Sequence, residues 1–286
     1  MEVKTAESYT FGDLMVYEKT FERNSVEWRY TISGNGKKTL FAILSNFAGH
    51  LLAIPFAEEL METYRVIALS VPPVQRFSET AEGLKDILDI ENITSCDVIG
   101  HSNGGVHFQN LISKYPQRIN KIVFSHSFTS MDKNDAFTIN ASEIKVYKTM
   151  RRILKVFPAS VLSFGLLAAA NGALYLKSGK KDTKKLKVLV RDYMKKYSKK
   201  DFLDMAVCME DFIFHYTFTT QYYANKPDNI LIIDSPTDNL ANPQQRAEMR
   251  RLCPGAREYQ FKKGGHITLI KCRQEYISIL KNFLGV

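Results

Sequence analysis

The stretch CDVIGHSNGGVHFQNLISKYP, from Cys96 to Pro116, decides the fold of this chain. A short apolar run gives way to a helical pattern there, and Ser102 lies between glycines at the point of change. A bare G-x-S-x-G pattern appears by chance in roughly one chain in ten of this size, so its surroundings carry the evidence. A strand before the serine and a helix after it are the context of a nucleophile elbow.

The glycines around the serine fit such an elbow. A sharp strand-to-helix turn brings neighbouring Cα atoms close together, so the residues two before and two after the serine must be small. Gly100 and Gly104 occupy these positions. The start of a helix also favours developing negative charge, through its dipole and its free N–H groups. We therefore interpret Ser102 as a nucleophile; the alternative is a glycine-rich turn without chemistry.

A serine hydroxyl becomes a good nucleophile when a base takes its proton and a third group orients the base. In this chain order the acid follows a late strand and the histidine lies beyond the last strand. KKGGHITLI supplies His266 in that place, and NILIIDSPTDNLANP supplies two acids. We expect Asp238 to be the acid because it lies beyond the strand tip, whereas Asp234 can cap the turn. Asp132, after the strand that follows the elbow, is a third candidate.

The oxyanion hole needs two backbone N–H donors, one after the nucleophile and one from the loop after the third strand. Asn103 supplies the first by its position, and Phe47 in LSNFAGH is expected to supply the second. His101 beside the nucleophile is expected to pack or orient rather than act as the base. The sequence indicates no partner for His107 or His126.

Apolar runs of strand length alternate with helical patterns along most of the chain. The runs cover residues 15–21, 25–32, 39–44, 64–69, 96–100, 121–125, 229–233 and 257–261; the helical patterns cover residues 51–61, 78–90, 103–115, 243–252 and 273–284. The first two runs predict an antiparallel hairpin, and the rest predict a mostly parallel sheet flanked by helices, which is an α/β fold. The alternation stops over residues 132–227. We expect residues 1–131 and 228–286 to form the core, with 132–227 inserted as a helical cap over the edge where open sheets bind ligands.

The composition predicts a cytoplasmic protein with one large core. The chain has 286 residues, of which 45% are hydrophobic, and its four cysteines show no C-x-x-C spacing. No metal or organic cofactor is implied. The N-terminal residues lack the pattern of a secretory signal, and the most apolar segment, residues 156–170, is shorter than the roughly 20 residues that span a membrane.

The net charge of +9 is concentrated in one segment. Residues 177–200 contain eleven Lys or Arg residues and two Asp residues, so the remainder of the chain is neutral. Apolar residues recur there at helical spacing, which predicts one helix with a basic, solvated outer face; they are Leu186, Leu189, Val190, Tyr193, Met194 and Tyr197. A single basic helix is not typical of a nucleic-acid binder. Docking to an anionic membrane or to a partner is the alternative role.

Four segments resemble the α/β-hydrolase superfamily in order and spacing: GHSNGG, YPQRINKIVF, ILIIDSPTDNLANP and KKGGHITLI. The resemblance covers about residues 39–284 apart from the cap. It implies an α/β-hydrolase fold, and it gives Ser102, Asp238 and His266 the roles of a Ser–His–Asp triad. YRVIALSVPPV, and the segment from ILIID to GAREYQFKKGG, are also similar to the maspardin family, whose members are regarded mainly as binding proteins.

Two positions depart from the family pattern. Ser45-Asn46 stands where many relatives carry His-Gly after the third strand, which puts the oxyanion loop in question. The usual glycine ahead of the acid is replaced in the segment DSPT, at residues 234–237, which keeps Asp234 and Asp238 both open. Neither departure removes a catalytic group.

We expect a serine hydrolase that cleaves a small-molecule carboxylic ester or thioester through an acyl-enzyme on Ser102. The apolar residues 161–170 of the cap favour a lipophilic acyl or alcohol group. The rival is a non-catalytic relative that binds a partner or a small ligand through its cap. Lyase chemistry or cofactor-free oxidation at the same triad is a third possibility.

Overall fold

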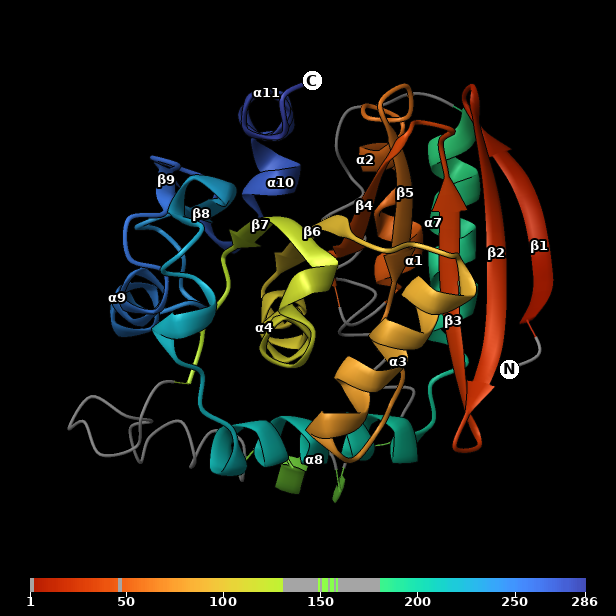
Figure 1. The fold of residues 1–286 in the computed structure, drawn as a ribbon. Helices are drawn as coiled ribbons and strands as arrows, with labels where there is room; N and C mark the ends of the chain where they lie inside the picture. The colour runs from red at the N-terminus through yellow and green to blue at the C-terminus, as the bar shows by residue number, and fades with distance from the viewer. Residues whose placement is uncertain are drawn as a thin grey trace.

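One mixed sheet runs through the molecule (Figure 1). The computed structural model describes residues 3–45, 48–130, 149, 151–153, 155–156, 158 and 181–286. Within these residues the strands lie in the order β1-β2-β3-β5-β4-β6-β7-β8-β9. Phe47, Asp132 and the apolar residues 161–170, all named in the sequence analysis, lie outside the described residues.

The strands agree closely with the apolar runs. They are β1 (Val3–Phe11), β2 (Leu14–Arg23), β3 (Val26–Ser33), β4 (Lys38–Ile43), β5 (Tyr64–Leu69), β6 (Cys96–His101), β7 (Ile119–Ser125), β8 (Ile230–Asp234) and β9 (Arg257–Gln260). From β5 to β9 every pairing is parallel, whereas β1, β2, β3 and β5 pair antiparallel. The predicted α/β-hydrolase fold, with a mostly parallel sheet flanked by helices, is confirmed.

The hairpin of β2 and β3 turns at Asn24 and Ser25, which both have positive φ angles, of 49° and 60°. Two consecutive residues of this kind make the turn whose twist suits a two-residue hairpin. Strand β1 was not predicted, because its sequence VKTAESYTF is mostly polar. It pairs only with β2, at the edge of the sheet, where a strand needs little apolar character.

Helices cover both faces of the sheet. Among the described residues they are α1 (Gly49–Leu52), α2 (Ile54–Ala57), α3 (Phe77–Ile90), α4 (Asn103–Lys114), α7 (Lys181–Met194), α8 (Lys199–His215), α9 (Pro243–Leu252), α10 (Thr268–Lys271) and α11 (Arg273–Leu284), with the short 3₁₀ turns η1 (Pro116–Arg118), η2 (Thr220–Tyr222), η3 (Pro227–Asn229) and η4 (Gly265–Ile267). One hydrophobic core joins the sheet to α3, α4 and α9, and the other joins it to α1, α2, α7 and α11. Helix α8 contributes to both cores.

A single helix was predicted over residues 51–61, and this prediction is wrong. Two four-residue helices, α1 and α2, stand there instead. Pro55 lies in the first turn of α2, where its missing N–H costs nothing. The apolar spacing correctly predicted helical residues that face the core, since both helices bury apolar side chains. It did not predict that the proline starts a new helix.

The basic segment also forms two helices rather than one. Helix α7 ends at Met194, and Ser198 begins α8 because its hydroxyl accepts a hydrogen bond from Asp201 N while the Asp201 carboxylate accepts one from Ser198 N. This reciprocal pair is a capping box, which fixes a helix start. Val190, Met194 and Tyr197 are buried as expected.

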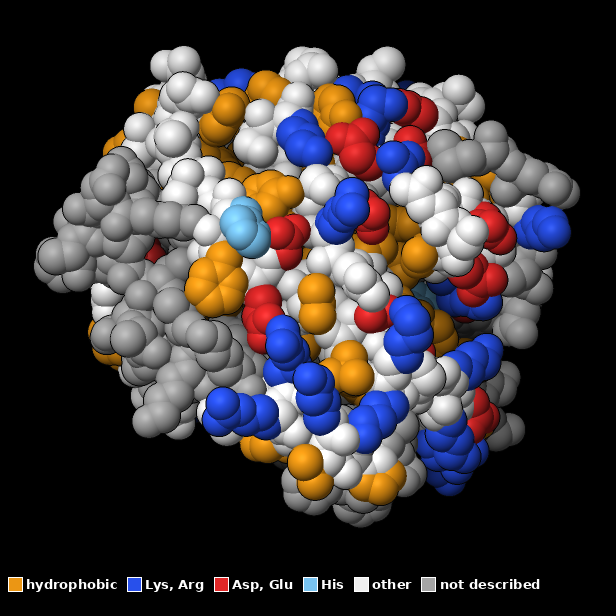
Figure 2. All heavy atoms as spheres, turned by 90° about the horizontal axis from the view of Figure 1, so that it is seen from below, with side chains coloured by type: hydrophobic (Ala, Val, Ile, Leu, Met, Phe, Trp, Pro, Cys, Tyr) orange, Lys and Arg blue, Asp and Glu red, His pale blue; other side chains and the backbone are white. Residues whose placement is uncertain are grey.

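Helix α8 lies across the end of the sheet at which the parallel strands finish (Figure 1). The loop after β5 and the start of α3 are each joined to it: Gln75 donates a hydrogen bond to Asp204, and the Phe77 N–H donates one to Asp211. Viewed from this side, the surface carries Lys and Arg side chains interspersed with Asp and Glu (Figure 2). No helix in the described ranges has the length and apolar character that a membrane crossing needs.

The register of the central strands brings four chain segments to one edge. Ile43 of β4 pairs with Gly100 of β6, His101 pairs with Ser125 of β7, and Ser125 pairs with Ile233 of β8. Because these strands are parallel, the residues that follow them emerge side by side at the carboxyl edge. The serine of the elbow and the loops of the acid and the histidine all follow strands at this edge.

Buried histidines make the fold sensitive to acid. His107 of α4 is 3% exposed, its ring centroid lies 5.7 Å from that of Phe77, and its Nδ1 atom has no hydrogen-bond partner among the described residues. Burial lowers the pKa of His107 to about 3. Below about pH 6.5, His107 therefore binds a proton in the unfolded chain but not in the folded chain. The free energy of unfolding is highest above that pH and decreases as the pH falls.

We expect His107→Leu to flatten this pH dependence. Between pH 6.5 and 3, each such histidine lowers the free energy of unfolding by about 1.4 kcal/mol per pH unit. Urea unfolding at pH 8, 6, 5 and 4 measures the free energy of unfolding at each pH. Its decrease with falling pH should be smaller in the variant, by the amount that corresponds to one bound proton. The values at pH 8 report the packing change alone, since neither state is protonated there. Parallel wild-type and variant curves would contradict the assignment.

Candidate active site

Ser102 lies at a strained turn between β6 and α4. Its φ and ψ angles are 55° and −127°, a backbone conformation that a non-glycine residue seldom adopts. The Ser102 N–H donates a hydrogen bond to Ser125 O at 2.9 Å, and the Ser127 hydroxyl donates one to Ser102 O at 3.0 Å. Bonds on both sides of the residue hold the turn, which is how such strain persists.

The neighbouring glycines are required by space. A Cβ atom built on Gly100 would lie 2.4 Å from Gly105 Cα, and one built on Gly104 would lie 2.1 Å from Ile43 O. Both contacts are too short for any larger residue. The structure thus has the backbone turn and the close approaches that the sequence predicted for a nucleophile elbow.

Asp238 and His266 form a direct pair. The His266 Nδ1 atom lies 2.9 Å from Asp238 Oδ2 and 3.1 Å from Oδ1. Gly264 and Gly265, which precede the histidine, have φ angles of 111° and 62°, so the loop bends in a way that glycine allows at little cost. Gly265 N also donates to Thr237 Oγ1 at 3.2 Å, which joins the loop of the histidine to that of the acid.

The carboxylate of Asp238 is buried and ionised. Burial by itself would raise its pKa, but hydrogen bonds from His126, His266 and the Ala241 N–H outweigh burial and hold the pKa well below its ordinary value. Because an ionised carboxylate only accepts hydrogen bonds, the Nδ1 atom of His266 carries a proton. In its neutral form His266 therefore presents an unprotonated Nε2, which is the form a general base needs.

His126, for which the sequence indicated no partner, contacts the same carboxylate. Its Nδ1 lies 2.7 Å from Asp238 Oδ2, and its Nε2 lies 2.7 Å from Thr268 Oγ1. His126, Asp238 and His266 offer donor atoms within 4.8 Å of one another, of the types that transition metals bind. Hydrogen bonds to one shared carboxylate account for this closeness, so the cluster does not need a metal ion to hold it together.

His101 immediately precedes Ser102 in the chain, and its ring packs against the rings of His126 and His266. Its ring centroid is 5.0 Å from that of His266, and its Nδ1 lies 3.1 Å from the Ser125 hydroxyl. Burial, and then the neighbouring His266 and His126, lower the pKa of His101 well below its ordinary value, so the ring stays neutral. The ring packs beside His266, which agrees with the packing role expected for it and places His266 against the last residue of β6.

No hydrogen bond joins Ser102 and His266 themselves, both of which are among the described residues. In structures without substrate, catalytic hydrogen bonds are often long and tighten only when substrate binds. Asn103 is the first residue of α4, so its N–H has no partner within the helix and is free to donate at the elbow. The second expected donor, Phe47, lies outside the described residues.

Asp234, the alternative acid, has a structural partner instead. Its carboxylate accepts hydrogen bonds from Arg250 at 2.6 Å and from Gln260 at 3.1 Å. These contacts tie the end of β8 to α9 and β9, and they leave the carboxylate without a contact to His266. Of the two acids in NILIIDSPTDNLANP, only Asp238 contacts the histidine.

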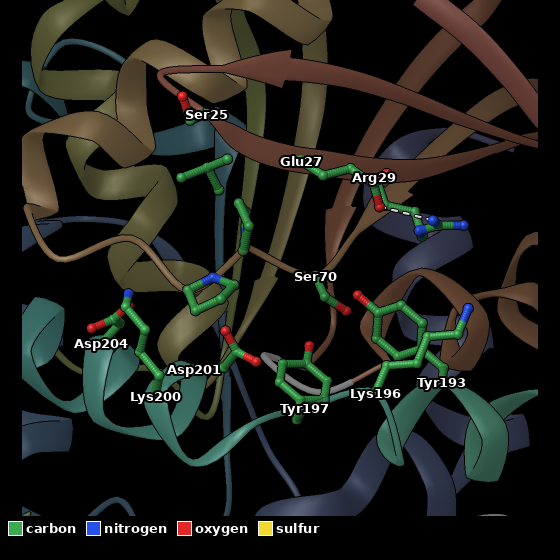
Figure 3. A pocket seen from close by; sticks show the side chains of 13 residues that line it. Ser25, Glu27, Arg29, Ser70, Tyr193, Lys196, Tyr197, Lys200, Asp201 and Asp204 are labelled. Atoms are coloured by element: carbon green, nitrogen blue, oxygen red, sulfur yellow. Dashed lines mark hydrogen bonds and ion pairs between the residues drawn. The ribbon is translucent and has the colours of Figure 1, made fainter.

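A cavity of about 350 Å³ opens at the same edge of the sheet (Figure 3). Ser70, which follows β5, lies at its back, while Tyr193 and Tyr197 reach in from α7 and the turn after it (Figure 3). The charged residues of the lining balance in sign; they are Arg29, Lys196 and Lys200 against Glu27, Asp201 and Asp204. This mixed lining gives no support of its own to a lipophilic substrate.

Comparison with known proteins identifies the family. A family model described as the alpha/beta hydrolase fold matches residues 24–271. The chain belongs to the α/β-hydrolase family. A sequence search of curated proteins finds no match for this α/β-hydrolase, so its similarity to the maspardin family stays a prediction.

Solved structures are similar over nearly the whole chain. A hydrolase from Pseudomonas aeruginosa PA01 matches with a TM-score of 0.69 at 15% identity, covering 94% of this α/β-hydrolase and 98% of that chain. An enol-lactonase from Burkholderia xenovorans LB400 gives 0.66 at 15%, covering 93% and 100%. A carboxylesterase structure from Nitrososphaera gargenis gives 0.68 at 17%, covering 93% and 97%. At these identities the likeness establishes the fold alone.

Proposed function

We propose that this α/β-hydrolase is a serine hydrolase that cleaves a carboxylic ester or thioester. The observation that carries the proposal is the Asp238–His266 pair, whose histidine ring packs against His101, the residue before the strained serine. A buried ionised carboxylate that fixes the tautomer of a partly exposed histidine is the arrangement that makes a serine nucleophilic. The esterase and lactonase among the similar structures agree with this reaction class.

The proposed reaction has two steps. His266 Nε2 takes the proton of Ser102 Oγ as the oxygen attacks the ester carbonyl carbon, and the same proton then passes to the leaving alcohol or thiol. The acyl group remains bound to Ser102. His266 then takes a proton from water as the water oxygen attacks the acyl carbon, and it gives that proton to Ser102 Oγ as the acyl–serine bond breaks, which releases the acid and the free serine. Asp238 stays ionised throughout and stabilises the imidazolium.

The negative charge that develops on the carbonyl oxygen needs donors aimed at it. We assign this role to the backbone N–H groups of Asn103 and Phe47. The cap over residues 132–227 and the lipophilic character of the substrate stay predictions, as does contact of the basic residues 177–200 with an anionic surface. Exposed basic side chains at the end of α7, such as Lys195 and Lys196, agree with such a contact.

The alternative is a non-catalytic relative that binds a ligand through its cap. The observation in its favour is Ser45-Asn46 at the place where many relatives carry His-Gly. A binding protein, however, has no need of an ionised carboxylate oriented on a histidine beside a strained serine. Reactivity of Ser102 therefore separates the two functions.

The test is labelling with a fluorophosphonate probe, read by intact mass. We expect one label per chain in the wild-type protein and none in Ser102→Ala or His266→Ala, because the serine needs its base. Ser113→Ala is the matched control: this serine lies at the other end of α4, and its hydroxyl donates only to Asn110 O. A folded wild-type protein that stays unlabelled would favour the binding function.

A further inference from the structure

His126 is a buried group at this site that the proposed reaction does not use. It follows β7 directly, its φ angle is +50°, and its side chain is completely buried. The His126 N–H donates to Ile233 O at 2.7 Å, which locks its backbone to β8. A left-handed conformation at a residue with a bulky side chain is unusual, although histidine and asparagine adopt it more often than most residues. The position of this ring therefore depends on a strained backbone at His126.

The ring bridges the two loops that carry the acid and the base. Its Nδ1 contacts Asp238 Oδ2 at 2.7 Å, and its Nε2 contacts Thr268 Oγ1 at 2.7 Å. Thr268 is fully buried, begins α10 and stands two residues after His266. One side chain therefore holds both members of the Asp238–His266 pair, one directly and the other through its neighbour.

The hydrogen bonds around Asp238 explain why a second histidine matters. Oδ1 accepts the N–H groups of Leu240 and Ala241, at 2.8 and 3.0 Å, and Oδ2 accepts Nδ1–H from both His126 and His266. The donor from His126 fixes the rotation of the carboxylate, so that Oδ2 faces His266. Without it, Oδ2 would keep only His266 as a partner, and the two backbone donors on Oδ1 would have to hold the carboxylate against rotation.

We propose that His126 is a positioning residue, which holds Asp238 and the loop of His266 so that His266 keeps its proton on Nδ1 and its Nε2 free. The expected effect of His126 on the reaction rate rests on the proposed hydrolase function. Its expected effect on the tautomer of His266 rests on hydrogen bonding alone. His126 touches neither the serine nor the substrate. Its removal therefore acts on kcat rather than on KM.

Three variants test the proposal. In His126→Asn, the amide nitrogen takes the place of Nδ1 and can still donate to Asp238, and asparagine suits the left-handed backbone. His126→Leu keeps bulk without a donor, and Thr268→Val removes only the hydroxyl that Nε2 contacts, with no change at a strained position. Thermal melting of each variant establishes that it is folded.

We expect kcat for a p-nitrophenyl ester to fall about 100-fold in His126→Leu and about 10-fold in Thr268→Val, because small displacements of a catalytic pair cost rates of this order. His126→Asn keeps the donor to Asp238 but has no atom in the place of Nε2, so its kcat should fall about 10-fold, as in Thr268→Val, and KM should be unchanged in all three variants. A purely structural role would lower thermal stability without this division between Asn and Leu. A folded Leu variant with wild-type kcat would overturn the proposal.

A second readout does not depend on activity. Nitrogen-15 NMR of labelled histidines distinguishes the Nδ1–H tautomer of His266 from the Nε2–H tautomer. We expect Nδ1–H in the wild type and in His126→Asn, and a mixture in His126→Leu. If the wild type hydrolyses no ester, the hydrolase function fails while the tautomers still decide the role of His126. An unchanged His266 tautomer in His126→Leu would overturn that role.

Discussion

Asp238→Asn is expected to lower kcat/KM about 10⁴-fold while leaving the protein folded. Asparagine has nearly the same shape as aspartate, but it carries a donor where the carboxylate has an acceptor. N–H donors face both oxygens of Asp238, from Leu240 and Ala241 on Oδ1 and from His126 and His266 on Oδ2. The two backbone donors favour the carbonyl oxygen of an asparagine on their side, so its NH₂ group would face the histidine Nδ1–H groups. The His266 ring would turn over or move its proton to Nε2, and it could then no longer take the proton of Ser102.

Asp234→Asn is the matched control, because it makes the same substitution four residues earlier, at the end of β8. Asp234 is 3% exposed and holds Arg250 and Gln260, so its loss should lower the melting temperature with little change in kcat. Steady-state hydrolysis of a p-nitrophenyl ester and thermal melting of both variants make the comparison. The acid is assigned wrongly if Asp234→Asn loses activity on this scale and Asp238→Asn does not.

The pair of variants also addresses the choice that the sequence left open. Asp234 ends β8 and Asp238 lies four residues later in the loop, and local patterns favour the second only through the reach expected beyond the strand tip. The structure adds that Asp234 faces α9 and β9, whereas Asp238 faces the histidine loop. Such directions depend on contacts with Arg250 and His266, which are distant in the chain, and not on the loop sequence itself.

Local physical rules account for what could be predicted. The buried strands are continuous apolar runs because helices cover both faces of the sheet, so β5 was predicted at its exact bounds, Tyr64–Leu69. The elbow was predicted because its glycines are required by close contacts within a few residues and with one neighbouring strand. The hairpin followed from two apolar runs with a short turn between them.

The role of His126 could not be predicted in this way. Its partners Asp238 and Thr268 are 112 and 142 residues away in the chain, and nothing in the sequence around SHSFTS indicates them. The only available signal was the place of His126 at the end of the strand after the elbow, the position that had already made Asp132 a candidate acid. A contact between two loop tips is set by the register of the sheet, and residue spacing does not reveal that register.

Gly104→Ala is expected to destabilise the fold by more than about 3 kcal/mol, or to prevent folding altogether. The added methyl group would lie 2.1 Å from Ile43 O, 2.8 Å from Ile43 Cγ2 and 2.9 Å from Ile43 Cβ. Ile43 is fully buried and paired with Gly100 in the centre of the sheet, so its backbone cannot move aside without breaking the ladder between β4 and β6. Urea unfolding, together with soluble yield, measures the loss.

Gly285→Ala separates this steric effect from that of backbone conformation. Gly285 ends α11 with a φ angle of 78°, and a Cβ atom built there meets nothing within 4 Å. Its replacement should therefore cost only the 1–2 kcal/mol or so of a left-handed alanine. Gly104 is helical and pays no such cost, so a larger loss there can come only from the contact with β4. Equal losses in the two variants would mean that α4 can shift away from the sheet, and the close packing that fixes Ser102 at the elbow would then be weaker than these distances imply.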